Sequence, residues 1–174
     1  MPDIAPPPGR LEMIPVERCV VPDVRVTAVY DEEQLRLLHD SLGAMGQVQP
    51  IVVVARDGVY DVVDGLHRLQ EARNRGEREI QAIVREGSAG SALLLNLILN
   101  RARGKTKASE MVKVIQVLTD RHGLDSEAID ARTGLGRDYI ERLQSICRAS
   151  PADMEVLDQE VIGIRVAYEL SRFP

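Results

Sequence analysis

Apolar and polar residues follow different periods in successive parts of the chain. Segment 11–26 has short apolar stretches interrupted by two prolines, a pattern typical of short edge strands. From Asp31 onward the leucines recur at helical spacing, and three acidic residues lie in the first turn, where carboxylates stabilise the helix dipole. The pattern predicts a helix that ends near Gly43 or Gly46.

A β-hairpin is predicted next. The apolar runs Ile51–Val54 and Val59–Val63 are separated by a turn that contains Asp57-Gly58, a dipeptide that readily supplies the positive φ of a tight turn. Helical spacing follows over Leu66–Arg75, and a β-branched run follows over Ile80–Val84. These periods together predict a mixed α/β domain.

After the Gly- and Ser-rich stretch 87–91 the pattern becomes helical throughout. Apolar helices are predicted over Ala92–Asn100 and Ala108–His122. Two further helices, Ser126–Thr133 and Arg137–Cys147, flank a Gly-Leu-Gly turn, which is typical of a helix-turn-helix unit. Pro151 and Gly163 punctuate a final pair of short helices.

The predicted fold class is therefore α+β, with two domains. Residues 1–10 are Pro-rich and predict a flexible lead. Residues 11–104 form the mixed domain, and residues 105–174 form an all-α domain that contains the helix-turn-helix unit.

The net charge of −5 opposes indiscriminate binding to nucleic acid, but the charges are unevenly distributed. Residues 1–100 carry ten arginines against fifteen acids, whereas residues 101–149 carry ten Lys or Arg against seven acids. We expect a polyanionic partner to contact the second segment, although the same charges also fit a mixed solvated helix surface.

The remaining composition narrows the cellular setting. Apolar runs fall far short of the roughly 18 residues that a membrane span needs, and the N-terminus lacks the basic and apolar regions of a secretory signal. We therefore expect a cytoplasmic protein without a membrane partner. Cys19 and Cys147 are isolated, which predicts packing roles and neither a disulfide framework nor a zinc site.

The junction from Asp64 to Arg68 is the segment best suited to bind an anion. A predicted strand ends at Asp64, and His67 and Arg68 lie in the first turn of the next helix. Helix N-termini attract phosphate, Gly65 permits close backbone approach, and Arg68 can grip phosphate oxygens in bidentate fashion. A plain strand-to-helix turn with an exposed arginine fits the same residues.

Residues 11–172 resemble the ParB partition family and, in their first part, the ParB/sulfiredoxin fold. The stretch Gly46-Gln47-Val48-Gln49-Pro50-Ile51 resembles the family's G-x-x-x-P-I loop, and Asp64–Leu69 resembles its nucleotide-binding turn. ParB proteins usually have Gly-Glu-Arg-Arg there, so two of four positions match. Sulfiredoxin has a cysteine where Leu66 stands, so its thiol chemistry is not expected. The resemblance implies nucleotide contacts from Gln47, Pro50, Ile51, Asp64, Gly65, Leu66, His67 and Arg68.

A second element resembles the family's Glu-Asn-x-x-Arg motif, which meets the triphosphate and its Mg²⁺. Asn100 and Arg103 match this motif, and Leu99 replaces its glutamate. The resemblance implies CTP or another nucleoside triphosphate as ligand, with Asn100 as a Mg²⁺ ligand and Arg103 near phosphate. Hydrolysis of CTP is in doubt because the family relies on the missing carboxylate.

The predicted helix-turn-helix unit resembles the central DNA-binding domain of ParB proteins. Its second helix carries Arg137, Tyr139 and Arg142, whose early positions face base edges in such units. Lys105, Lys107 and Arg132 are candidate phosphate contacts. The acids Asp138 and Glu141 on the same helix oppose tight binding, and a helical packing domain without a ligand is the alternative.

The leading hypothesis is a nucleoid-associated, DNA-binding protein whose homodimer closes as a clamp when CTP binds, in partition or gene regulation. A partition ATPase is a candidate partner. The main alternative is a small-molecule kinase of the same fold that uses ATP or ADP, with Asp64, Glu32 or Glu33 as the base. A two-metal nuclease would need more carboxylates than Asp61 and Asp64. ParB proteins generally have a further C-terminal dimerisation domain. The resemblance, which ends near Ser171, does not include that domain.

Overall fold

The computed structural model describes residues 9–28, 30–103, 106–146, 155–156 and 158–159, with the side chain of Arg103 outside the description. The chain forms two compact units. The mixed unit comprises Met1–Pro22 and Tyr30–Ala92, and the helical unit comprises Asp23–Val29 and Leu93–Pro174.

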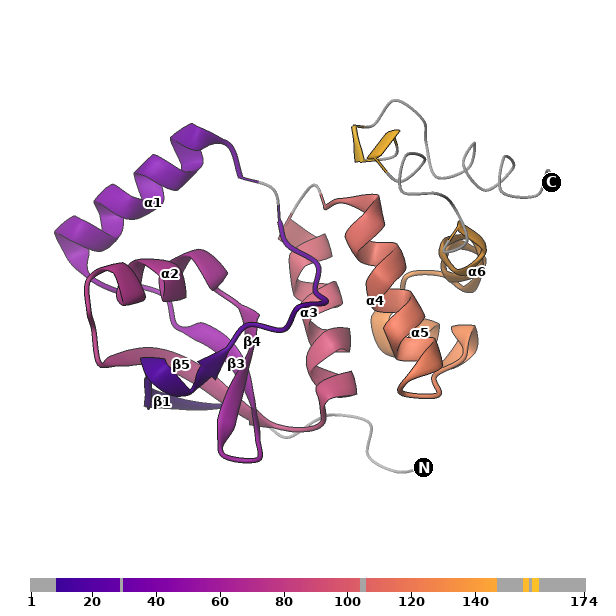
Figure 1. The fold of residues 1–174 in the computed structure, drawn as a ribbon, viewed down its shortest axis with the longest axis horizontal. Coiled ribbons are helices and arrows are strands. Elements are labelled where there is room, and N and C mark those ends of the chain that lie inside the picture. The colour runs from indigo at the N-terminus through magenta and orange to yellow at the C-terminus, as the bar shows by residue number, and fades with distance from the viewer. Residues whose placement is uncertain (1–8, 29, 104–105, 147–154, 157, 160–174) are drawn as a thin grey trace. The chain divides into compact units, whose positions relative to one another are not determined.

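The mixed unit contains a five-stranded sheet in the order β1-β5-β3-β4-β2 (Figure 1). The hairpin β3–β4 and the pair β1–β5 are antiparallel, whereas β3–β5 and β2–β4 are parallel. The strands are β1 (Arg10–Pro15), β2 (Cys19–Val20), β3 (Ile51–Arg56), β4 (Val59–Asp64) and β5 (Glu79–Glu86), with a short 3-10 turn at Val16–Arg18.

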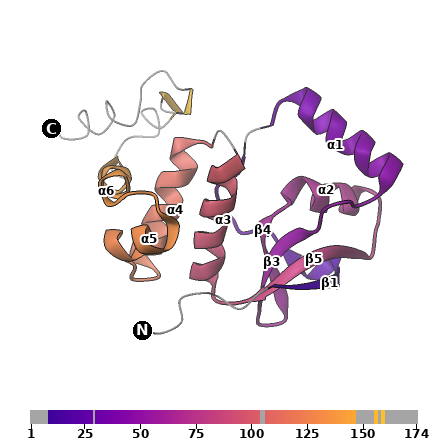
Figure 2. The same ribbon diagram turned by 180° about the vertical axis from the view of Figure 1, so that it is seen from behind.

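Two helices belong to this unit, α1 (Glu32–Met45) and α2 (Leu66–Asn74). Leu69 and Ala72 of α2 are buried together with apolar residues of the sheet, including Ile14, Ile51 and Ile80. Figure 2 shows α2 next to the sheet and α1 beyond α2, as in the first view. Most of α1 is exposed, and Leu42 is its buried residue.

The helical unit is built from α3 (Ala89–Arg103), α4 (Ala108–Asp120), α5 (Ser126–Thr133) and α6 (Arg137–Ile146). Its core contains fully buried side chains from α4, α5 and α6, together with three leucines of α3. These residues include Leu93, Leu94, Leu97, Ile115, Leu118, Ile129, Ile140, Leu143 and Ile146. Burial of this shared apolar surface holds the four helices together.

The boundary between the units differs from the sequence-based division after residue 104. It falls within α3, because the leucines from Leu93 onward are buried against α4 and its neighbours. Residues 23–28 also join the helical unit, where Val26 is fully buried and held by the side chain of Asn96. A linear pattern of apolar residues does not reveal which core each residue joins.

The predicted elements are confirmed with small shifts at their ends. α1 ends at Met45 with Gly46 as its C-cap, the hairpin turns at Asp57-Gly58, and α5 has the predicted bounds. α3 begins at Ala89, earlier than predicted, because Ser88 caps the Ser91 amide and so starts the helix. Cys147 and the final helix pair lie outside the described residues, apart from a fragment near residue 155.

Cys19 is buried in the mixed unit, and this burial raises the pKa of its thiol. Its predicted packing role agrees with that position.

None of the helices in the described part of the chain has the length and apolar character that a membrane span needs.

Candidate functional site

The strand-to-helix turn after β4 depends on Gly65. This residue is the N-cap of α2 and has a φ of 90°, in the left-handed region. A Cβ here would lie 2.6 Å from Cγ2 of Ile51 and 3.2 Å from its Cα. Glycine alone therefore fits both the conformation and the space. No side chain caps the α2 N-terminus, which leaves this helix end suited to an anion.

Arg68 ties this turn to the loop before β3. Its Nη1 donates to the carbonyl oxygens of Gln49 at 2.8 Å and Pro50 at 2.6 Å. Its Nη2 lies 3.6 Å from the carboxylate of Asp64, whose side chain is only 5% exposed. The guanidinium thus neutralises a buried carboxylate and fixes two carbonyl groups, and a phosphate at this turn would share Arg68 with those partners.

Gln47 fixes the same loop to the edge of β5. Its side-chain nitrogen donates to the Gln81 carbonyl at 2.7 Å, and its side-chain oxygen accepts from the Gln81 N–H at 2.8 Å. The nitrogen also lies 3.1 Å from the Gln49 carbonyl. Gln47, Pro50 and Ile51 therefore lie near the turn, where their observed contacts build the loop, and their contact with a nucleotide stays a prediction.

His67 has an aromatic neighbour that the sequence pattern does not predict. The rings of His67 and Tyr30 meet edge to face, with centroids 5.2 Å apart and planes at 89°. Tyr30 comes directly before α1, so this contact joins the start of α1 to the anion-suited turn. Leu66 and His67 are both half-buried.

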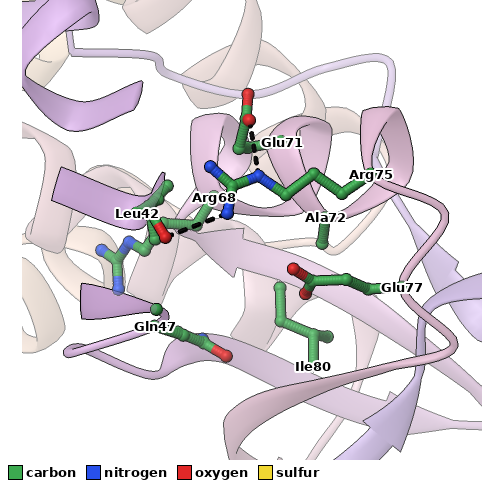
Figure 3. Close-up of a pocket in the computed structure, with 9 residues that line it drawn as sticks. Leu42, Gln47, Arg68, Glu71, Ala72, Arg75, Glu77 and Ile80 are labelled. Carbon is green, nitrogen blue, oxygen red and sulfur yellow. Dashed lines mark hydrogen bonds and ion pairs between the residues drawn. The ribbon is translucent and has the colours of Figure 1, made fainter. Parts of the chain in front are cut away.

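A small hollow lies beside the turn and is lined by residues of α1, α2, β5 and their loops (Figure 3). Arg75 Nε donates to Glu71 Oε1 at 2.8 Å, and Arg75 Nη1 donates to the Leu42 carbonyl at 2.9 Å. His39 Nδ1 lies 3.1 Å from the same Glu71 oxygen. The Arg75 hydrogen bond, with His39 adding to it, holds the pKa of Glu71 below its ordinary 4.5. These polar groups join the end of α1 to α2.

Asn100 lies in the helical unit, and its side chain is engaged there. Its Oδ1 accepts from the Ala28 N–H at 3.3 Å, and its Nδ2 donates to the Asn96 carbonyl at 2.9 Å. The residue is 4% exposed, and the neighbouring Leu99 offers no oxygen ligand. Among the described residues, no group of three His, Cys, Asp or Glu side chains could hold a metal ion. A role for Asn100 as a Mg²⁺ ligand beside a bound triphosphate therefore stays a prediction.

The backbone of the turn between α5 and α6 has a positive φ at two glycines, which lets one helix end and the next begin within a few residues. Gly134 ends α5 in the left-handed region with a φ of 65°, and Gly136 has a φ of 86°. Asp130 Oδ1 accepts from the Gly136 N–H at 2.8 Å and so fixes the turn. Asp125 caps the start of α5 through the Ala128 N–H.

The predicted cations around this turn differ in their availability. Arg132 and Lys107 are exposed, at the end of α5 and the N-cap of α4, and Arg142 is half-buried. Arg137 is exposed but paired, with its Nε 2.8 Å from Glu141 Oε1, which raises the pKa of Arg137. The side chains of Lys105 and Arg103 lie outside the described residues.

Tyr139 faces α3, away from the outer surface of α6. The Arg101 guanidinium lies 4.8 Å from the centre of its ring, and Arg101 Nη1 donates to its hydroxyl at 3.3 Å. The hydroxyl also contacts Met111 Sδ at 3.8 Å. Tyr139 therefore stabilises the helical unit through a cation–π contact and holds α6 against α3 and α4.

Three structural groups were not predicted from the sequence: Asn96, the Glu71–Arg75 pair and Arg101. Asn96 had one recognisable signal, because a polar residue interrupts an otherwise apolar helix. Glu71 and Arg75 show the spacing of an i,i+4 ion pair, but nothing in that spacing indicates the contact with α1.

The fold and the strand-to-helix turn define an α+β protein with a ParB N-domain architecture. A truncated ParB of Caulobacter crescentus complexed to the centromeric parS site matches 94% of this chain and 86% of that chain, with a TM-score of 0.60 and 20% identity. A Pnob8-like ParB-N domain matches 93% and 79%, with a TM-score of 0.61 and 14% identity. At these identities the likeness shows the fold.

The family model of the ParB N-terminal domain matches residues 7–101, and the chain belongs to this family. The nucleoid occlusion protein of Halalkalibacterium halodurans is 26% identical over 87% of this chain and 54% of its own length. The chromosome-partitioning protein ParB of Myxococcus xanthus is 28% identical over 87% of this chain and 50% of its own length. The chain spans about half the length of these curated relatives.

Proposed function

We propose that this chain is a DNA-binding protein of the partition type whose binding to DNA changes when CTP binds. The observation that carries the proposal is the α5–α6 pair, two short helices joined by a turn with Gly134 and Gly136, which fits a helix-turn-helix unit. Its second helix exposes Arg137 in the first turn, the part of a recognition helix that reaches base edges. Exposed Lys107 and Arg132 are available to contact phosphates.

The comparisons support the same function. Curated relatives from several bacteria are named chromosome-partitioning or nucleoid occlusion proteins, and a structure of the same fold holds the parS site. By analogy we infer that the chain acts on the nucleoid, as a homodimer that closes around DNA, and that a partition ATPase is a possible partner. This part of the proposal rests on family membership.

The nucleotide part rests on the β4–α2 turn. Gly65 supplies the left-handed backbone that this turn requires, and the uncapped helix end with Arg68 suits a phosphate group. Mg²⁺ is the expected counter-ion of a bound triphosphate. Arg103 is the proposed second phosphate contact, and hydrolysis is expected to be weak because Leu99 replaces the family's glutamate.

DNA binding is tested by fluorescence anisotropy with duplexes that contain the parS site and with scrambled duplexes, at salt from about 50 to 200 mM. The expected result is tighter binding to one sequence class and a steep loss of affinity with salt. Arg132→Ala should weaken binding to all duplexes about equally, because it removes a phosphate contact. Absence of binding to every duplex at the lowest salt would overturn the proposal.

Nucleotide binding is tested by calorimetric titration with CTP, ATP and GTP in Mg²⁺. Selective CTP binding that is lost in Arg68→Ala and Arg103→Ala supports the proposal. Arg78→Ala is the matched control, since Arg78 is exposed just before β5. Circular dichroism establishes that each variant is folded. Preference for ATP would favour the kinase, and no binding by any nucleotide would remove the nucleotide part alone.

A further inference from the structure

The exposed face of α6 carries an unusual combination of charges for a helix that binds DNA. Arg137, Asp138 and Glu141 are exposed along it, so acids outnumber bases on this strip. By contrast, Gln144 turns inward and donates to Thr119 Oγ1 at 3.0 Å. Such a strip gains little from phosphate attraction, and its charges need another explanation.

Arg137 and Glu141 form a single preorganised unit. Arg137 Nε donates to Glu141 Oε1 at 2.8 Å, and Ser126 Oγ of α5 donates to the same oxygen at 3.2 Å. Both partners lower the pKa of Glu141, the arginine more than the serine. The carboxylate is therefore ionised at neutral pH and held by two helices, and its hydrogen bonds restrict the arginine side chain.

The hydrogen-bonding groups that remain match one base pair. Arg137 uses Nε for Glu141, while Nη1 lies 3.9 Å from Glu127, too far for a hydrogen bond. Within the described part of the chain, the hydrogen bonds of the Glu141 carboxylate all go to Oε1, which leaves Oε2 as an acceptor. Two terminal N–H groups suit guanine O6 and N7, and a free carboxylate oxygen suits the cytosine N4 amino group.

The geometry points to Arg137 and Glu141 as a joint reader of one G·C base pair in the major groove. This inference rests on the proposed DNA-binding function and adds a base preference to it. Arg137 donates to guanine, and Glu141 both orients the arginine and accepts from cytosine. A carboxylate also repels phosphate, so the pair favours the matched site mainly by weakening binding elsewhere.

The test is selection of bound sequences from a randomised duplex library, followed by anisotropy with the selected duplex and with single base-pair replacements. The expected consensus contains an invariant G·C pair, whose replacement weakens binding by the unmodified chain on the order of tenfold or more. Glu141→Ala and Arg137→Ala should lose this discrimination at that pair and retain discrimination at the other positions.

Glu127→Gln is the matched control, because it removes a nearby exposed carboxylate of α5 that makes no hydrogen bond to Arg137. It should leave the G·C preference unchanged. The inference is overturned if Glu141→Ala raises affinity equally for all duplexes, since Glu141 would then act only as a repulsive charge. Failure of every duplex to bind would instead overturn the proposed function itself.

Discussion

Asn96 and Val26 exchange two hydrogen bonds inside the helical unit. The Val26 N–H donates to Asn96 Oδ1 at 2.7 Å, and Asn96 Nδ2 donates to the Val26 carbonyl at 3.1 Å. Val26 is fully buried and Asn96 is 3% exposed, so water cannot replace these bonds. A single side chain therefore satisfies both backbone groups of a residue far away in the sequence.

Asn96→Leu should lower the free energy of unfolding by about 2 to 5 kcal/mol, because it leaves a buried N–H and a buried carbonyl without partners. Urea unfolding measures this loss, and hydrogen exchange should show faster exchange of the Val26 amide. Asn74→Leu, at the exposed end of α2, is the control and should change stability by less than about 0.5 kcal/mol. Equal effects of the two substitutions would contradict the role assigned to Asn96.

Gly65→Ala should cost about 2 to 5 kcal/mol, since a left-handed backbone strains alanine and its Cβ would meet Ile51 at 2.6 Å. Gly76→Ala separates the two causes. Gly76 also has a positive φ, of 66°, but nothing lies within 4 Å of its Cβ position. It should cost about 1 to 2 kcal/mol from strain alone. Equal losses in urea unfolding would show that the contact with Ile51 contributes nothing.

Arg68→Met should destabilise the mixed unit by about 3 to 5 kcal/mol, because the buried Asp64 carboxylate would lose the guanidinium that lies 3.6 Å from it. Adding Asp64→Leu should recover part of the loss, although the carbonyls of Gln49 and Pro50 would still lack a donor. Thermal and urea unfolding of the single and double variants check the order. A double variant less stable than Arg68→Met would refute the pairing.

Glu71 should make stability depend on pH in the acidic range. Its pKa in the folded chain lies below the ordinary 4.5, so the folded state binds a proton less readily than the unfolded state. The stabilisation is present above the unfolded pKa and is lost as the pH falls through the folded value. The difference in unfolding free energy between the unmodified chain and Glu71→Gln should therefore shrink on acidification below about pH 4.5.

Glu77→Gln is the control for this titration, since Glu77 lines the same hollow and has no ion pair among the described residues. It should leave the acid limb of the stability profile unchanged. A stability difference for Glu71→Gln that stays constant from neutral to strongly acidic pH would contradict the depressed pKa.

Local patterns in the sequence determined most of the element types. Asp57-Gly58 predicts its hairpin, and Gly134 and Gly136 predict the break between α5 and α6. The reason is that the ability to adopt a positive φ belongs to the residue type itself. Helical and alternating periods likewise depend only on neighbours along the chain. The residues of the strand-to-helix turn could be proposed for the same reason.

Tertiary structure decided which groups are already engaged. Arg68 looks available in the sequence, but its guanidinium lies against Asp64 and donates to two carbonyl groups. The side-chain amide of Asn100 is hydrogen-bonded to Ala28 and Asn96. Residues 23–28 and most of α3 join the helical core for a similar reason. Burial and hydrogen bonding between distant residues depend on where the chain passes in space, and no local period encodes that path.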